Sequence, residues 1–163
     1  MELNKEFWHD KKVFITGHTG FKGSWLSLWL HQLGAKVYGY SLEPPARPNL
    51  YEALTLDANI EGVIGDIRTY DFLNQSISDV NPEILIHMAA QPLVRDSYLD
   101  PRYTYETNIM GTVNTLDIAK KNKTIKSVLV ITSDKCYHNA EKNYHYKESD
   151  SLGGHDPYSS SKG

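Results

Sequence analysis

The fold is decided near the N-terminus, where residues 13–23 read VFITGHTGFKG. The first four residues are apolar or β-branched, as expected for a short buried strand, and three glycines follow within seven positions. Residues 24–33 carry apolar side chains at helical spacing, and Gly34 is placed to end that helix. A strand, a glycine-rich turn and a helix in this order present a helix N-terminus to a phosphate group.

This order of elements predicts a dinucleotide-binding turn. Gly17 permits the tight bend, Gly20 lets backbone amides approach the anion, and Gly23 allows close packing of helix on strand. His18 has two equal interpretations, a contact with the cofactor or a neutral turn residue, and Lys22 is either a pyrophosphate ligand or a solvated lysine. The expected cofactor contacts in this loop are Gly17, His18, Thr19, Gly20, Phe21, Lys22 and Gly23.

Length and composition bound the possible functions. The 163 residues are enough for about one domain, with 40% hydrophobic and 23% charged residues, as in ordinary globular proteins. The net charge of −3 leaves no basic surface, so we expect neither nucleic acid nor a membrane as a partner. The N-terminus has no signal-peptide core, and the single cysteine, Cys136, agrees with a reducing compartment, so we expect a cytoplasmic protein. None of the seven histidines forms a convincing metal site with Cys136, and we expect no metal.

Strands and helices alternate along the chain. We expect strands at residues 13–16, 36–42, 62–67, 83–90 and 127–133, and helices at 24–33, 69–80 and 101–122, with a helical turn near 50–54. Phe7 and Trp8 are expected to cover one end of the sheet. The segment 134–157 has no periodicity and is interpreted as a loop, of which residues 137–146 are either an ordinary loop or a lid. The alternation predicts an α/β fold, a Rossmann-type doubly wound parallel sheet with strand order 3-2-1-4-5.

In open α/β sheets, ligands lie beyond the carboxyl ends of the strands. Besides the glycine loop, three segments are expected there: residues 66–67, 89–91 and 133–135. Asp66 has two equal interpretations, an acceptor for an adenine amino group with Ile67 packed on the ring, or a helix N-cap. Ala89 and Ala90 are either small residues that admit a nicotinamide ribose or a site of ordinary close packing.

Tyr158 and Lys162 are four residues apart and share one face of the helix that they begin. A protonated lysine lowers the pKa of a neighbouring phenol from about 10 and makes it a usable base near neutral pH. The chain ends at Gly163, in the first turns of this helix. We therefore expect a chain that is truncated before its last elements.

Together these motifs resemble the extended short-chain dehydrogenase/reductases of the NAD-dependent epimerase/dehydratase family. The resemblance rests on GHTGFKG at 17–23, DIR at 66–68, HMAAQPLVRDSY at 87–98, TSDKCY at 132–137 and LGGHDPYSSSK at 152–162. It is strongest to the CDP-glucose 4,6-dehydratases, because the dTDP-glucose and GDP-mannose dehydratases carry Asp-Glu in place of Asp134-Lys135. The resemblance implies that residues 1–163 are an incomplete NAD-binding Rossmann domain that lacks its substrate domain and is inactive alone.

That family converts a nucleotide-activated hexose to its 4-keto-6-deoxy derivative, a precursor of surface polysaccharides, with NAD as an internal shuttle. The resemblance implies that Tyr158 removes the C4 hydroxyl proton, that Lys162 holds the nicotinamide ribose, and that Ser133 hydrogen-bonds the C4 oxygen. Asp134, if kept protonated, would donate a proton to the departing C6 hydroxyl. Lys135 is left with three interpretations: the base at C5, a cation that stabilises enolate charge, or a solvated lysine.

Further residues follow from the same resemblance. Gln91 is assigned to the cofactor site or the sugar nucleotide, Arg95 to a substrate phosphate, and Asn108 to the family's structural asparagine near the cofactor. Cys136 is expected to be a small buried filler. A homodimer is implied, formed through the helix near 103–120 and the helix that begins at Tyr158.

The end of the second strand departs from the usual pattern. An acidic residue there normally binds the adenosine ribose, but this chain reads GYSL at 39–42. The resemblance implies NAD, the missing acid predicts that it does not bind tightly, and Arg47 keeps NADP as an alternative. Two other functions remain open: a different nucleotide-sugar dehydratase or epimerase, which the Asp134-Lys135 pair disfavours, and a non-catalytic NAD-binding domain.

Overall fold

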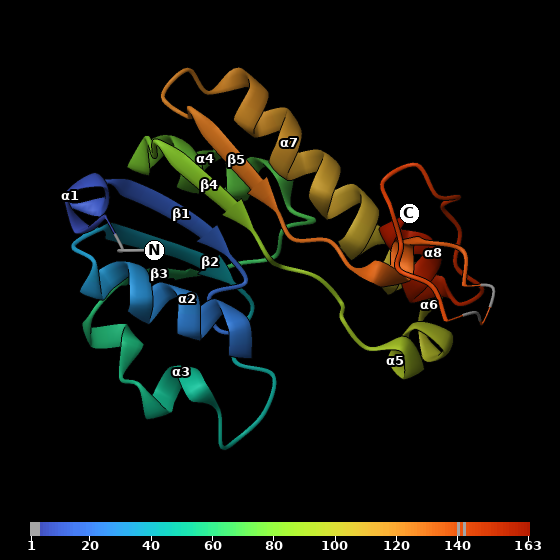
Figure 1. Ribbon diagram of the computed structural model, residues 1–163. Coiled ribbons are helices and arrows are strands. Elements are labelled where there is room, and N and C mark those ends of the chain that lie inside the picture. Colours follow the sequence, from blue (N-terminus) through green and yellow to red (C-terminus); the bar gives the residue numbers. More distant parts are fainter. Residues whose placement is uncertain (1–3, 140, 142) are drawn as a thin grey trace. The chain divides into compact units, whose positions relative to one another are not determined.

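The computed structural model describes residues 4–139, 141 and 143–163. Its strands form one parallel sheet in the order β3-β2-β1-β4-β5, which confirms the predicted topology (Figure 1). The strands are β1 (Lys12–Thr16), β2 (Lys36–Ser41), β3 (Glu61–Ile64), β4 (Ile84–His87) and β5 (Ser127–Val130). The pairing of β4 with β5 ends at His87 and Val130. The apolar residues that follow lie outside the sheet, so both strands end earlier than predicted.

The helices that the structure describes follow the predicted positions with four additions. They are α1 (Lys5–Trp8), α2 (Phe21–Gln32), α3 (Leu50–Ala53), η1 (Leu56–Ala58), α4 (Tyr70–Val80), α5 (Val94–Leu99), α6 (Pro101–Tyr105), η2 (Glu106–Met110), α7 (Gly111–Lys121), η3 (Asp134–Cys136) and α8 (Pro157–Lys162). The predicted long helix over 101–122 is interrupted by η2, a π-helical turn. Periodicity does not predict α1, η1, α5 or η3, because a helix of one or two turns carries too few apolar repeats.

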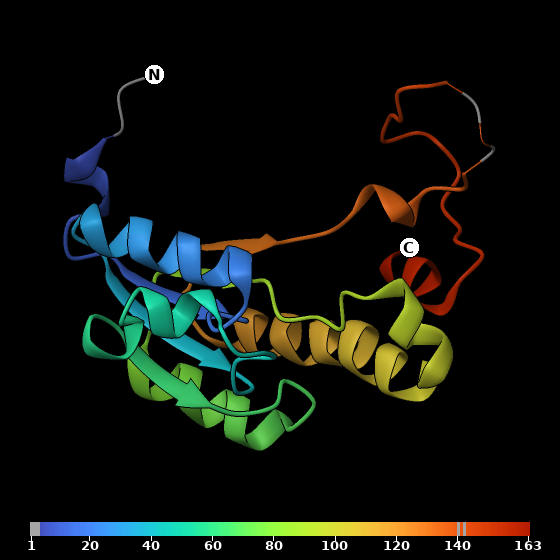
Figure 2. The ribbon, with the colours of Figure 1, turned by 90° about the horizontal axis from the view of Figure 1, so that it is seen from below.

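The chain divides into two compact units, each described by itself. The first contains Met1–Ala89 and Asn114–Val130, and the second contains Ala90–Val113 and Ile131–Gly163. In the first unit, α2 and α3 lie on one face of the sheet and α4 with the end of α7 lies on the other (Figures 1 and 2). In the second, α8 packs against α5, α6, η2 and η3.

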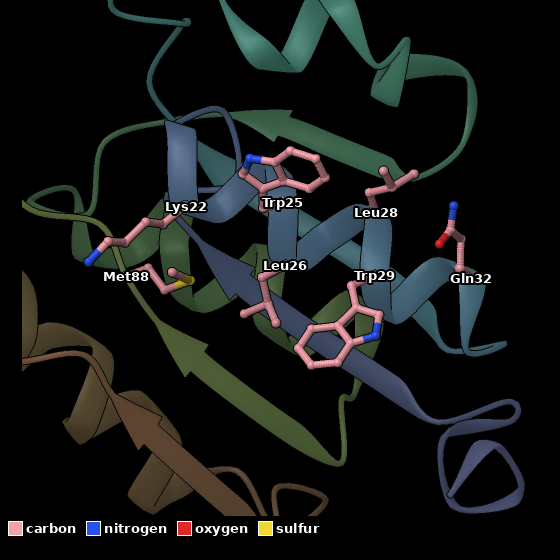
Figure 3. A pocket seen from close by; sticks show the side chains of 7 residues that line it. All are labelled: Lys22, Trp25, Leu26, Leu28, Trp29, Gln32 and Met88. Atoms are coloured by element: carbon pink, nitrogen blue, oxygen red, sulfur yellow. The ribbon is translucent and has the colours of Figure 1, made fainter. Parts of the chain in front are cut away.

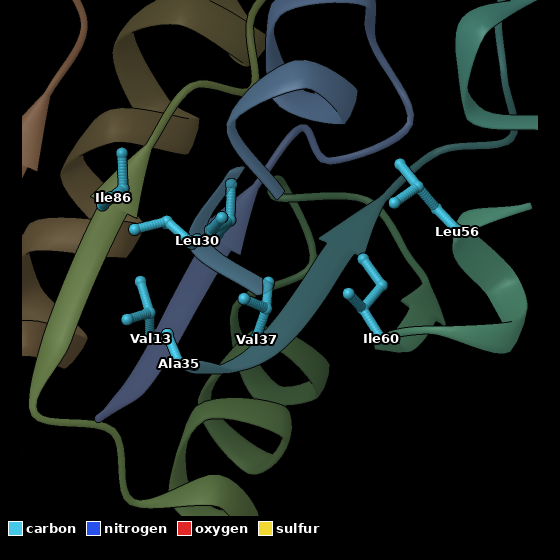
Figure 4. Close-up of a cluster of buried hydrophobic side chains, with 8 residues drawn as sticks. Val13, Leu30, Ala35, Val37, Leu56, Ile60 and Ile86 are labelled. Carbon is cyan, nitrogen blue, oxygen red and sulfur yellow. The ribbon is translucent and has the colours of Figure 1, made fainter. Parts of the chain in front are cut away.

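Two apolar clusters hold the first unit together, one on each face of the sheet. Because side chains alternate along a strand, Val13 and Ile15 of β1 enter one cluster and Phe14 enters the other. The cluster beneath α2 consists of Val13, Ile15, Leu30, Ala35, Val37, Leu56, Ile60 and Ile86 (Figure 4). Trp8 packs against this cluster, whereas Phe7 is half exposed, so only one of the two aromatic residues covers the sheet as predicted.

The outer side of α2 is apolar. The indoles of Trp25 and Trp29 are half exposed and line a pocket of about 440 Å³ together with Lys22, Leu26, Leu28, Gln32 and Met88 (Figure 3). In the described ranges, no helix has the length and apolar character that crossing a membrane requires.

Candidate functional site

The turn after β1 has the geometry that its glycines predict. Gly17 has a φ of +83°, and a Cβ on it would lie 2.8 Å from the backbone nitrogen of Ala89. A Cβ on Gly23 would lie 2.0 Å from the carbonyl oxygen of Gly17. A side chain at either position would therefore push the loop away from β4 or α2, and the predicted tight bend and close packing are both present.

The N-terminus of α2 is open for an anion. The helix begins at Phe21, three residues earlier than predicted, and its N-cap Gly20 provides no side-chain hydrogen bond. The first amides of a helix have no carbonyl partner within it, and they carry the positive end of the helix dipole. Phe21 and Lys22 are exposed at this end. The turn therefore fits a pyrophosphate held by main-chain amides, although the role of Gly20 as a point of approach stays a prediction.

Two hydroxyls join the glycine loop to the end of β2. Thr19 Oγ1 lies 2.8 Å from Ser41 Oγ and 2.8 Å from the carbonyl oxygen of Leu42. Both side chains are buried, with Thr19 3% and Ser41 8% exposed. The sequence shows the missing carboxylate at Ser41 but not this pair, because nothing in it connects residues 22 positions apart.

The imidazole of His18 is wholly buried beneath the loop. Neither ring nitrogen has a hydrogen-bond partner among the described residues, and the ring lies edge-on to Tyr51 with centroids 5.4 Å apart. Burial lowers the pKa of His18 to about 4, so the ring is neutral at pH 7. This geometry favours the neutral turn residue over a side-chain contact with a cofactor.

Asp66 forms a turn of its own after β3. Its Oδ1 accepts the backbone amide of Arg68 at 2.9 Å, and its Oδ2 lies 2.6 Å from Arg68 Nη2. The N-cap of α4 is Thr69, so the interpretation of Asp66 as that N-cap is wrong: its carboxylate bonds two residues ahead, before the helix begins. Burial raises the pKa of Asp66, but the hydrogen bonds from Arg68 outweigh it and lower the pKa overall. The carboxylate is thus an ionised acceptor, while Ile67 is buried in the core.

The start of the loop after β4 is held against β1. Thr16 Oγ1 accepts the amides of Met88 and Ala89, at 3.1 and 3.2 Å, and lies 2.7 Å from His87 Nδ1. Ala89 is also the residue that a Cβ on Gly17 would meet. The close approach at this point is thus between the Gly17 and Ala89 backbones, and the ribose contact predicted for Ala89 and Ala90 stays a prediction.

A buried polar network organises the second unit. Asn108 lies in the π-helical turn, where its Oδ1 accepts the amide of Gln91 at 2.8 Å and its Nδ2 donates to the Gln91 carbonyl at 3.1 Å and to Ser161 Oγ at 2.8 Å. The Gln91 side chain donates to Thr104 Oγ1 at 2.9 Å and to the Leu93 carbonyl at 3.0 Å. The Gln91 amide group is therefore bonded inside this unit, and Asn108 connects the loop after β4 to the helix that carries Tyr158 and Lys162.

The segment 133–135 and helix α8 lie together in the second unit. Ser133 Oγ accepts the amide of Lys135 at 3.2 Å and lies 3.3 Å from Asp134 Oδ1, and the turn η3 packs against α8. Asp156 caps α8 through the amide of Ser159 at 2.8 Å. Burial raises the pKa of Asp156, but the hydrogen bonds from Ser159 and the nearby charge of Lys135 outweigh it and lower the pKa.

The side chains of the second unit differ in exposure. Asp134, Lys135 and Arg95 are exposed, whereas Tyr158 and Lys162 are half-buried. Burial lowers the pKa of Lys162. Cys136 is only half-buried, so its description as a buried filler is wrong: it lies in the short turn η3 rather than in a core. Among residues 4–139, 141 and 143–163, no cluster of three or more His, Cys, Asp or Glu side chains could hold a metal ion.

Comparison with known proteins connects this geometry to one group of enzymes. A family model described as GDP-mannose 4,6 dehydratase matches residues 14–163. The chain is 55% identical to a CDP-glucose 4,6-dehydratase of Salmonella typhimurium over 161 residues, 99% of this chain and 45% of the relative. It is 28% identical to a CDP-paratose 2-epimerase of Salmonella typhi over 93% of this chain and 50% of the relative. The predicted resemblance is confirmed.

The solved structures agree with the sequence relatives. The Bordetella bronchiseptica enzyme WbmH in complex with NAD+ matches with a TM-score of 0.79 and 29% identity, over 94% of this chain and 50% of that one. The chain spans about half the length of the relatives that it matches.

Proposed function

The chain belongs to the GDP-mannose 4,6-dehydratase family, and from this premise we propose that it forms the NAD-binding part of a CDP-glucose 4,6-dehydratase. The 55% identity to the Salmonella typhimurium enzyme supports the CDP-glucose substrate. The observation that carries the proposal is the packing of η3 against α8 within the second unit. This packing joins Ser133, Asp134 and Lys135 to the helix of Tyr158 and Lys162.

The glycine loop supports NAD as the cofactor. The uncapped amides at Phe21 and Lys22 would hold the pyrophosphate, and Gly17 and Gly23 keep the loop tight enough for this approach. The ionised carboxylate of Asp66 would accept the adenine amino group. NAD would supply a hydride acceptor for the C4 position of the sugar and return that hydride to C6.

The side chains of the second unit would move the protons of the reaction. Tyr158 would take the C4 hydroxyl proton, and Ser133 would donate a hydrogen bond to the C4 oxygen. Oxidation at C4 acidifies the C5–H bond. Water can then leave across C5 and C6 if Lys135, in its role as base, takes the C5 proton and a protonated Asp134 donates its proton to the departing C6 hydroxyl. Lys162, which lies on the same face of α8 as Tyr158, would stabilise the phenolate as a neighbouring cation.

Lys135 has the two roles that its chemistry permits, a base at C5 or a cation beside the enolate. Its charge contributes to lowering the pKa of Asp156, which places an ammonium and a carboxylate within electrostatic reach of one another. Both roles stay alternatives for Lys135.

An apolar stripe supports a homodimer. Tyr105, Ile109 and Val113 follow one another at intervals of four residues along α6, η2 and α7, and they are 36%, 40% and 49% exposed. Residues at this spacing lie on one face of a helix. A second copy of the chain that presents the same stripe would bury both surfaces.

Incubation of the purified protein with NAD and CDP-, dTDP-, UDP- or GDP-glucose tests the proposal, with the alkaline ultraviolet absorbance of 4-keto sugars as the readout. We expect a 4-keto product from CDP-glucose only when the protein includes the substrate domain, and none from the 163-residue chain alone. Turnover of CDP-glucose by residues 1–163 would contradict this division, and epimerised sugars without a 4-keto product would favour an epimerase.

A matched pair of variants separates catalysis from packing. Tyr158→Phe removes the proposed base and should lower turnover about 10²- to 10⁴-fold. Tyr137→Phe makes the same change outside α8 and should leave the rate within about twofold of the parent. Equal rates in the two variants would remove Tyr158 from the mechanism.

A further inference from the structure

We propose that Ser41 accepts a hydrogen bond from the adenosine ribose, in the place where other dinucleotide-binding sheets have a carboxylate. Thr19 makes the Ser41 hydroxyl an acceptor, and the pair thereby selects NAD over NADP. This inference rests on the proposed cofactor function. Ser41 is the last residue of β2, where the ribose-binding acid of such sheets lies. Thr19 belongs to the glycine loop that would hold the pyrophosphate.

The direction of the two hydrogen bonds follows from counting protons. A carbonyl oxygen can only accept, so Thr19 must donate its single hydroxyl proton to Leu42 across 2.8 Å. The 2.8 Å contact between Thr19 Oγ1 and Ser41 Oγ then requires Ser41 to be the donor. The only hydroxyl proton of Ser41 is therefore used in the bond to Thr19. Ser41 can take part in a further hydrogen bond only as the acceptor.

The pair is held rigidly in this arrangement. Thr19 is 3% and Ser41 8% exposed, and the Ser41 carbonyl accepts the amide of Gly65 at 2.8 Å in the ladder between β2 and β3. Breaking the contact between the two hydroxyls would leave a buried polar group without a partner, which is costly. The acceptor character of Ser41 is thus fixed before a ligand arrives.

An acceptor at this position distinguishes the two cofactors. The ribose hydroxyl of NAD is a donor and matches the lone pairs of Ser41, whereas the 2′-phosphate of NADP offers acceptor oxygens that find no proton there. The candidate phosphate ligand, Arg47, has its guanidinium 3.3 Å from the carboxylate of Glu52. A neutral acceptor forms a weaker hydrogen bond than a carboxylate, which agrees with the modest NAD affinity expected from the missing acid.

Calorimetric titration of the purified protein with NAD, NADP and 2′-deoxyadenosine NAD tests the inference. We expect the parent to bind NAD about tenfold more tightly than the 2′-deoxy analogue, and Ser41→Ala to bind both equally. Thr19→Val keeps the shape but frees the Ser41 proton, so the ratio of the NADP and NAD dissociation constants should fall about tenfold. Thr19→Ser restores the hydroxyl and should restore the ratio.

The readouts are ratios, and a general loosening of the loop would change both dissociation constants together. The inference would be overturned if Thr19→Val left the ratio of the NADP and NAD dissociation constants unchanged and Ser41→Ala still bound NAD more tightly than the 2′-deoxy analogue. The cofactor proposal would remain intact. A parent protein that binds neither NAD nor NADP would overturn the cofactor proposal, and this inference with it.

Discussion

The imidazole of His18 fills the space that Gly39 leaves open on β2. A Cβ built on Gly39 would lie 2.3 Å from Cγ of the His18 ring, and a Cβ on Gly62 would lie 2.9 Å from its Nε2. Gly39 and Gly62 are register partners on β2 and β3, so two glycines side by side form a slot for one ring. The His18 side chain of the glycine loop is thereby fixed against the neighbouring strands.

This slot predicts that Gly39→Ala destabilises the protein by about 2 kcal/mol, because the added methyl group must displace a buried ring. Urea unfolding at pH 7 measures the change. The double variant His18→Ala with Gly39→Ala lacks the clashing ring atoms, so its free energy of unfolding should equal that of His18→Ala alone. Additive losses in the double variant would show that the ring and Gly39 do not compete for space.

The pKa of His18 predicts a loss of stability in mild acid. The folded-state pKa is about 4 and the ordinary value is 6.5, so between these values the unfolded chain binds a proton that the native state does not. Stability should therefore fall as the pH decreases from about 6.5 to 4, by about 3 kcal/mol in all. Urea unfolding across this range should show that the free energy of unfolding depends less on pH in His18→Leu than in the parent. The same pH dependence in both proteins would contradict the lowered pKa of His18.

The Asn108 network predicts a large penalty for its loss. Asn108→Ala removes three hydrogen bonds and leaves the amide and carbonyl of Gln91 without their side-chain partner, which should cost about 3 kcal/mol of unfolding free energy. Ser161→Ala removes only one of these bonds and should cost about 1 kcal/mol. Thermal or urea unfolding compares the two variants, and equal losses would show that the Gln91 bonds contribute nothing.

The role of Lys135 predicts a partial reaction. In the protein that includes the substrate domain, Lys135→Met should still oxidise C4 but should not eliminate water, because neither base nor cation remains beside C5. Reduced cofactor should then accumulate, as seen in its near-ultraviolet absorbance, without release of the 4-keto-6-deoxy product. Lys147→Met, a change of another exposed lysine in the same segment, is the control. Unimpaired dehydration by Lys135→Met would exclude any role for this residue.

The exposed stripe predicts that Ile109→Asp weakens self-association. A carboxylate buried in an apolar interface without a partner is strongly unfavourable, so the variant should sediment as a monomer at concentrations where the parent is a dimer. Glu106→Asp, on the same turn, should leave the dimer intact. A parent that is monomeric throughout would contradict the proposed dimer.

Local patterns were enough for the architecture. The apolar runs, the glycines and the breaks at Gly34 and Asn81 predict the strands and most helices, because each of these depends on neighbours within one turn or one strand. The strand order follows from the alternation of strands with helices and the rules for their connections. The sequence failed where an element is short or irregular. Periodicity cannot distinguish the π-helical turn at 106–110 from the helix on either side of it, since one extra residue hardly changes the apolar pattern.

The sequence by itself determined which chemical groups are present: a glycine loop after the first strand, a tyrosine and a lysine on one helical face, and no acid at the end of the second strand. Only the tertiary structure decided how those groups are bonded. It buried His18 in a slot between two glycines, made Asp66 a turn acceptor instead of a helix cap, and brought Thr19 to Ser41. The physical reason is that hydrogen-bond direction and burial depend on atoms far apart in the chain, and periodicity and spacing do not record which of those atoms meet.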